Sequence, residues 1–324
     1  MKRILSVFAL VAAAAAPAAA QGRAPICPTG TASEQLAANA CELGVDLFRY
    51  MAPQLGTAVA GGNATLGQGG ALGGFGHFAV GIRANGVFGS VPQIDGLSVA
   101  TGAPSSQSYE TSNQVVPMPV IDAAVGLFKG LPLGVTSVGG VDLLLNASYL
   151  PAFSNDQFDV ELPDGSLKVG YGARIGLLQE SIVSPGVSFT IMRRDLPTVN
   201  LTARPNAATQ IDATGLAVET TAWRITASKN LLAFGLALGA GQDSYDFAGN
   251  ATGTVTGGSA STPDLGFTMK RTNYFANVNL NILLAKVVGE IGMVQGGDVQ
   301  TFNTFDKKAD ASRVYGSVGF RVGL

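Results

Sequence analysis

Charged residues are scarce in this sequence. They make up 13% of its 324 residues, and the formal net charge is −2. Soluble domains carry about 25% charged residues, so this composition is unusual for a surface that faces water on all sides. The near-neutral balance and the lack of a basic cluster argue against nucleic acid as a partner.

Long apolar runs are also missing beyond the first twenty residues. A transmembrane helix needs about 18 or more such residues in succession, which argues against a helical membrane protein. Residues 1–20 combine a basic start, an apolar core (4–15) and the triplet Ala18-Ala19-Ala20. This pattern predicts a signal peptide cleaved after about Ala20, and therefore export. An uncleaved anchor helix is the alternative.

Cysteine is limited to Cys27 and Cys41, and histidine to His77. In an oxidising compartment, two cysteines this close in sequence favour a disulfide. A metal site is the rival interpretation, but two thiols without a neighbouring histidine make a poor one. We therefore expect a Cys27–Cys41 disulfide, no metal and no cofactor.

From His77 onward the sequence alternates apolar and polar residues with a period of two, which is typical of strands whose faces meet different surroundings. The last stretch has Val318 and Phe320 on one face, and Arg313 and Arg321 on the other. Ten segments show the pattern, at residues 77–85, 121–127, 141–149, 167–177, 187–191, 214–228, 233–241, 271–282, 287–293 and 313–324.

A tilted strand of about ten residues crosses a bilayer. The polar face of these strands carries Asn, Gly, Ser and single charges, which suits a narrow wet lumen, whereas a soluble sandwich would carry more Lys and Glu. We predict an all-β membrane fold. It is an antiparallel transmembrane β-barrel of about ten strands (range 8–14) over residues 77–324, with a short N-terminal helix. A change of phase within 214–228 predicts a bulge near Thr220.

The connections between the strands alternate in length. Short links occur at 130–137, 179–184, 229–230 and 283–286, and longer polar ones at, for example, 90–114 and 244–264. Outer-membrane barrels have short periplasmic turns and long external loops, and an even strand number places both termini in the periplasm. The segments 89–115 and 196–212 are long enough to contain a further pair of short strands.

A set of charged side chains is predicted to face the lumen. These charges either pair with one another across a filled interior or line a polar, mildly anion-attracting pore. The set consists of Arg83, Asp122, Asp142, Lys168, Arg174, Arg224, Arg271, Glu290, Arg313 and Arg321.

The segment ahead of the barrel, residues 21–76, is predicted to be a periplasmic or plug segment. Thr31 and Glu34 form a capping box, and apolar residues then recur at helical spacing, which predicts a helix over 32–51. This helix either packs under the barrel or plugs it. A glycine-rich tract follows over 52–76, and it either packs closely inside the lumen or serves as a flexible linker.

These features resemble those of bacterial outer-membrane β-barrels. The closing Phe320-x-Val322-x-Leu324 is similar to the C-terminal signal that such barrels present to their assembly machinery. The resemblance implies outer-membrane lipid and the barrel assembly machinery as partners. The helix and glycine-rich tract are also similar to the hatch of the long-chain fatty acid transporter family. The Asn-Pro-Ala motif common in that family is missing, and the chain is short for its fourteen strands.

Three functions are compatible with such a barrel. The first is a passive channel or transporter for small or hydrophobic solutes, which makes a small hydrophobic solute the expected partner. The second is a structural or surface-interaction barrel that acts through its extracellular loops. The third, an outer-membrane lipid hydrolase, would depend on the single His77, and no activated serine motif accompanies it. We expect no enzymatic activity.

Overall fold

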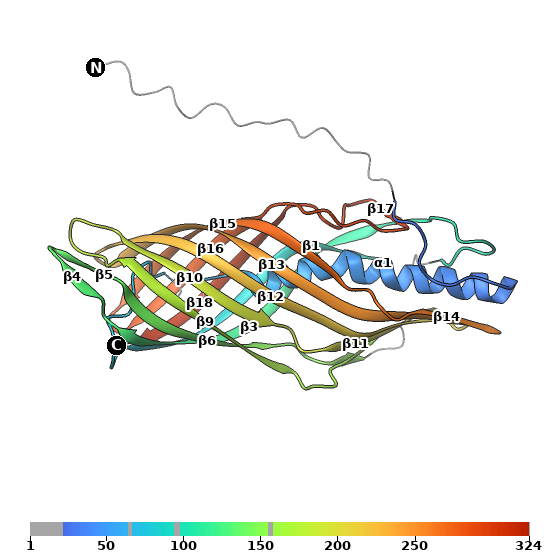
Figure 1. Ribbon diagram of the computed structural model, residues 1–324, viewed down its shortest axis with the longest axis horizontal. Helices are drawn as coiled ribbons and strands as arrows, with labels where there is room; N and C mark the ends of the chain where they lie inside the picture. The colour runs from blue at the N-terminus through green and yellow to red at the C-terminus, as the bar shows by residue number, and fades with distance from the viewer. Residues whose placement is uncertain (1–21, 64–66, 94–97, 155–157, 324) are drawn as a thin grey trace, which may run out of the picture.

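The computed structural model describes residues 22–63, 67–93, 98–154 and 158–323. Its strands form a closed antiparallel barrel around a single long helix (Figure 1). The predicted signal peptide (1–20) and Leu324 of the predicted assembly signal lie outside the described residues.

The barrel wall has ten strands, as predicted. Each strand pairs with the next one around the wall, and β18 closes the wall against β1 with a register that runs from Ala79↔Gly323 to Phe88↔Val314. In order around the barrel, the strands are β1 (Phe78–Pro92), β3 (Thr111–Phe128), β6 (Gly140–Tyr149), β9 (Leu167–Leu178), β10 (Gly186–Asp195), β12 (Thr209–Leu231), β13 (Phe234–Val255), β15 (Phe267–Ile282), β16 (Ala285–Val294) and β18 (Arg313–Gly323).

The two ends of the barrel differ. The short connections gather at one end, here called the turn end, where the longest of them forms the hairpin of β4 (Leu131–Leu133) and β5 (Thr136–Val138). The long connections gather at the opposite end, the loop end (Figure 1). They contain the short strands β2 (Ser108–Tyr109), β7 (Phe153–Ser154), β8 (Phe158–Glu161), β11 (Val199–Asn206), β14 (Gly258–Thr262) and β17 (Thr304–Phe305).

Two wall strands rise far beyond their neighbours at the loop end. β12 has 23 residues and β13 has 22, against 10 for β6 and β10. A bulge was predicted near Thr220. The structure has it a few residues earlier in the chain, where the register of β12 with β13 shifts between Thr214 and Ala217. Gly215 adopts φ +62° there, a conformation that glycine takes without strain, so the extra residue is accommodated at this position.

The outer face of the wall is apolar between two rings of aromatic side chains. Phe78 and Phe88 stand ten residues apart on β1. At a rise of about 3.3 Å per residue and a tilt of about 40°, that separation spans about 25 Å, the height of the apolar band of an outer-membrane barrel. The ring at the turn end contains Phe78, Phe128 and Phe234, and the ring nearer the loop end contains Phe88, Tyr149, Tyr171, Trp223 and Tyr274, all of them exposed.

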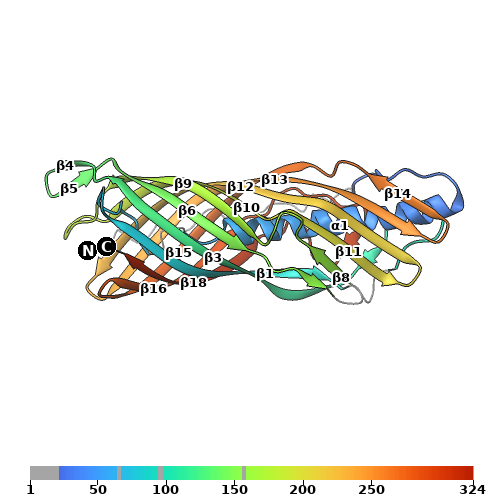
Figure 2. The same cartoon turned by 90° about the horizontal axis from the view of Figure 1, so that it is seen from below.

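Helix α1 (Ala32–Ala60) lies inside the barrel and runs along its axis from the loop end (Figures 1 and 2). Its capping box is present, with the Thr31 N–H donating to a Glu34 carboxylate oxygen at 2.5 Å. The prediction that the helix ends at residue 51 is wrong, because α1 continues through Pro53. Side chains of the wall and the helix satisfy polar groups in this last part: Gln54, for example, exchanges two hydrogen bonds with the backbone of Ser90.

The apolar band yields a paired test. Val318 is 65% exposed on the outer face of β18, about midway between the aromatic rings, and Val135 is 75% exposed in the β4–β5 turn. We expect Val318→Arg to lower the free energy of unfolding by about 2–4 kcal/mol in lipid. Val135→Arg should change it by less than about 0.5 kcal/mol. Urea unfolding in lipid vesicles measures both, and equal effects would contradict the placement of the band.

Candidate functional site, the helix inside the barrel

Three arginines of the wall converge on the carboxyl end of α1. Arg83 donates to the carbonyl of Gly61 at 2.7 Å, and Arg194 donates to that of Ala60 at 2.8 Å. Arg224 also reaches Ala60, at 3.1 Å. The last carbonyls of a helix have no partner within it and carry the negative end of its dipole, so guanidinium groups stabilise them. The wall thereby holds the helix at its carboxyl end, which points towards the turn end.

The same arginines connect to carboxylates of the wall. Arg83 pairs with Asp122 at 2.7 Å, and Arg224 pairs with Asp243. Arg194 has no carboxylate at ion-pair distance among the described residues, and it bonds instead to the carbonyls of Val59 and Ala60 at the helix end and of Gly62 just past it. All five side chains are at least nine-tenths buried. We call this group the charge lock.

Below the charge lock, the glycine-rich tract descends through the lumen towards the turn end. The Asp142 carboxylate pairs with Arg174 at 2.7 Å and accepts the Leu72 N–H at 3.1 Å. A Cβ added to Gly140 would come within 2.7 Å of the Ala71 methyl group. The tract therefore packs against the wall at a distance that only glycine allows, and is not a free linker along its described part.

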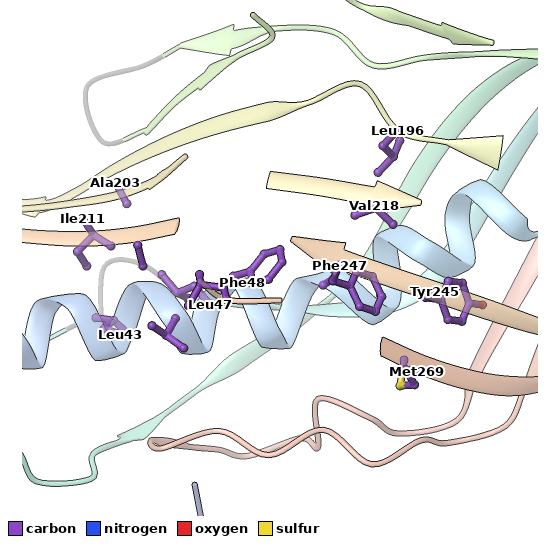
Figure 3. Close-up of a cluster of buried hydrophobic side chains, with 14 of the residues drawn as sticks. Leu43, Leu47, Phe48, Leu196, Ala203, Ile211, Val218, Tyr245, Phe247 and Met269 are labelled. Atoms are coloured by element: carbon purple, nitrogen blue, oxygen red, sulfur yellow. The ribbon is translucent and has the colours of Figure 1, made fainter. Parts of the chain in front are cut away.

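Above the charge lock, the helix packs in an apolar cluster formed by the upper parts of β12, β13 and β15. Figure 3 shows Leu43, Leu47 and Phe48 of the helix in this cluster together with Ile211 of β12 and Phe247 of β13. At Gly253 a Cβ would lie 2.3 Å from the Cys41 backbone nitrogen, so helix and strand meet backbone to backbone. This part of the helix lies beyond the upper aromatic ring, where it forms the core of the loop end.

At the loop end, a second polar cluster anchors the segment that precedes the helix. The predicted disulfide joins Cys27 to Cys41. Arg23 pairs with Glu42 at 2.6 Å and with Asp46 at 2.9 Å. Glu42 also accepts the N–H of Cys27 at 2.5 Å. We call Arg23, Glu42, Asp46 and the disulfide the N-terminal anchor.

Asp46 ties this anchor to the loop between β16 and β18. Its carboxylate accepts the backbone N–H groups of Phe302 at 2.9 Å and Asn303 at 2.6 Å. Burial raises the pKa of Asp46 above its usual range, and the nearby Arg23 charge opposes that shift. Glu42 and Asp46 are both fully buried, although charged residues of an amphipathic helix ordinarily face solvent. The helix is enclosed all round, so its charged positions meet partners and not solvent.

Most of the predicted lumen-facing charges are buried inside the barrel. Nine of the ten are less than 9% exposed, and Lys168 is half-buried. Arg271 and Arg313 serve the loop end, because each donates to a carbonyl of the β16–β18 loop, at Ala311 and Lys308 respectively. Arg321 donates to Gln68 of the descending tract at 2.5 Å. The exposed side chain of His77 lies at the turn end.

Two members of the charge lock were not among the predicted residues. Arg194 and Asp243 lie just past the ends assigned to their strands from the sequence pattern. Each keeps the inward parity of its strand, because Met192 and Gly241 precede them on the same buried face. Extending the period of two by one step from Gly241 reaches Asp243, and extending it by two steps from Thr190 reaches Arg194.

No known protein family and no curated protein matches the sequence significantly. Solved structures with related shapes include the attachment invasion locus protein Ail of Yersinia pestis (11% identity, 77% of this chain and 99% of that chain, TM-score 0.23). The translocator domain of the autotransporter NalP from Neisseria meningitidis also matches, with 11% identity over 76% of this chain and 88% of that chain and a TM-score of 0.36. The Pseudomonas putida toluene transporter TodX matches with 10% identity over 76% of this chain and 88% of that chain and a TM-score of 0.29. Likenesses this weak carry no argument about function.

The closed antiparallel wall, its apolar outer band and its charged lumen define the chain as an outer-membrane β-barrel. The resemblance to the long-chain fatty acid transporter family is not shown by these comparisons. Within the described part of the chain, no helix is long and apolar enough to span a membrane.

The charge lock predicts a large effect from a small change. Asp243→Asn would leave Arg224 buried without its anion, and we expect this change to lower the free energy of unfolding by about 3–5 kcal/mol. The matched control is Glu219→Gln, which breaks the pair with Arg193 on the surface, where Glu219 is 49% exposed. That change should cost at most about 1 kcal/mol. Urea midpoints in detergent measure both effects. An Asp243→Asn variant that is as stable as the wild type would argue against the charge lock.

Proposed function

We propose that this protein is a surface-interaction barrel of the outer membrane, closed by its own helix and acting through its loop end. One observation carries the proposal: α1 occupies the lumen towards the loop end, where its Gln54 and Thr57 side chains are fully buried and hydrogen-bonded to Ser90 and Arg271 of the wall. A passive channel needs a continuous water-filled path through the lumen, and α1 blocks that path. We also propose that the short turns face the periplasm, as in other outer-membrane barrels.

The helix gives the loop end its shape. Asn39 of α1 donates to the carbonyls of Ala100 and Gly102 in the β1–β3 loop, and Asp46 binds the β16–β18 loop. The same two loops pair with each other through β2 and β17. A rigid post inside a barrel thus holds several loops in one fixed arrangement, which suits a binding surface because little loop entropy is lost on contact.

A gated channel for small or hydrophobic solutes is the second candidate. Its support is the character of the lumen, where the charge lock and the Asp142–Arg174 pair would line a polar path once α1 moved away. A channel requires α1 to leave the lumen, whereas a surface-interaction barrel works with α1 in place.

A cross-link separates them. A Cβ at Gly44 would lie 3.5 Å from the Ala251 Cβ, which suits a disulfide. We expect wild-type protein in planar bilayers to be closed, and the Gly44→Cys/Ala251→Cys variant to be equally closed whether oxidised or reduced. A variant lacking residues 22–72 should conduct, because it exposes the charged lumen.

The opposite result would favour the channel. If wild-type protein conducts and oxidation of the engineered pair abolishes the current, α1 is a gate and the surface-interaction proposal fails. The same bilayers with the single variant Gly44→Cys, which cannot form the cross-link, control for the effect of the substitution itself.

We further propose that the protein has no lipid hydrolase activity. Most serine and cysteine hydrolases activate the nucleophile with a neighbouring histidine, and the sole histidine, His77, is exposed at the turn end. Purified wild-type protein and His77→Ala should release fatty acid from phospholipid at the same background rate. Fatty-acid release above background by the wild type that is lost in His77→Ala would contradict this proposal and support a hydrolase that uses His77.

A further inference from the structure

The two ends of the described chain lie at opposite ends of the barrel. At the loop end, the Arg23 N–H donates to the carbonyl of Thr301 in the β16–β18 loop at 3.1 Å. At the turn end, the Gly323 N–H donates to the carbonyl of Leu284 in the β15–β16 turn, also at 3.1 Å. The expectation that both termini share one side is therefore wrong for the described N-terminal segment. It holds for the barrel's own two ends, because β1 starts where β18 stops.

From Arg23 to the start of β1, the chain passes through the lumen in one direction, from the loop end to the turn end. The first turn of α1 lies against the β13–β14 turn, where a Cβ on Gly258 would come within 2.8 Å of the Ser33 carbonyl. Ala60 sits at the charge lock. Gly74 is packed against Lys129, beside the β4–β5 hairpin, and His77 then opens β1.

The geometry points to a barrel that carries its own N-terminal segment through to the outer face. Residues 22–31 emerge at the loop end and stand on the cell surface, while the start of β1 and the end of β18 stay in the periplasm. The inference rests on the membrane orientation given above, but not on the surface-interaction role. A channel with the same path would present the same segment outside.

Two features hold the segment in this position. The N-terminal anchor ties Arg23 to two carboxylates of α1, and the disulfide closes residues 27–41 around the helix start. Most of the segment is nonetheless exposed: Ala24, Pro25 and residues 28–31 face solvent, whereas Cys27 is buried. The segment is thus fixed in place and accessible along most of its length.

This topology constrains how the barrel forms. The descending tract touches wall strands on several sides: Gly69 donates to Ser228 of β12, and Leu72 donates to Asp142 of β6. A wall closed by the β18–β1 pairing surrounds that tract. Residues 22–31 therefore cross the membrane before the wall closes, or through the lumen of the closing barrel. A group attached at the start of the segment would be displayed outside without an export route of its own.

Epitope accessibility on intact cells tests the inference. One short epitope is inserted directly before Gly22, a second after Val135 in the β4–β5 turn, and a third after Ala207 in the β11–β12 hairpin, each in a separate variant. We expect antibody to reach the epitopes at Gly22 and Ala207 on intact cells to a similar extent. The epitope at Val135 should give a signal only after the outer membrane is permeabilised.

The failures are distinguishable. A protected Gly22 epitope beside an accessible Ala207 epitope would overturn the threading and leave the orientation standing. An accessible Val135 epitope with both others protected would overturn the orientation, and with it the proposed surface role. Heat-modifiable gel migration and the absence of free thiol show that each variant has folded with its disulfide. A protease site placed before Gly22, cut by protease added outside, gives a second readout that does not depend on antibody size.

Discussion

The structure depends on how charge is compensated in a closed lumen. A guanidinium group buried without a partner would destabilise the barrel by several kcal/mol. Arg83 and Arg224 have wall carboxylates, but Arg194 finds its partners at the carboxyl end of the helix, at the carbonyls of Val59 and Ala60 and of Gly62 just beyond it. The carboxyl end of α1 thus acts as a counter-charge for the wall. Barrel and helix therefore stabilise each other.

The helix has two different surroundings along its length. Its last turn sits in the polar lumen at the charge lock, whereas its first half lies beyond the upper aromatic ring, enclosed by the long strands β12 and β13. There the helix replaces the second sheet or domain that would otherwise support long loops. The unequal strand lengths follow from this, because the wall rises only where it has a helix to cover.

Much of the wall could be predicted from the sequence, because an apolar outer face and a polar inner face impose a period of two on every strand. The same parity identified Arg83, Asp142 and Glu290 as inward. It missed Arg194 and Asp243 because the segments were ended where the apolar face ended. At the top of these strands, buried contacts with the helix replace contacts with lipid, and the apolar signal fades.

The helix and its direction were harder to predict. Pro53 and the glycines after it are ordinary signals for a helix end, yet the enclosing wall keeps the chain helical to Ala60, and Gly56 leaves room for the ring of Tyr245. The capping box at Thr31 marks the start of the helix correctly, but a local motif carries no information about which mouth of the barrel that start occupies. The direction is set by contacts distant in sequence, such as Asp46 with Asn303.

Hydrogen exchange measured by mass spectrometry on the folded barrel in lipid nanodiscs tests the central claim most directly. If α1 is the enclosed core on which the wall and loops depend, amides of residues 37–60 will exchange as slowly as those of β12 and β13. They will become exposed only when the whole barrel unfolds. Rapid exchange of α1 beside a protected wall would show that the helix leaves the lumen freely, and would contradict the account.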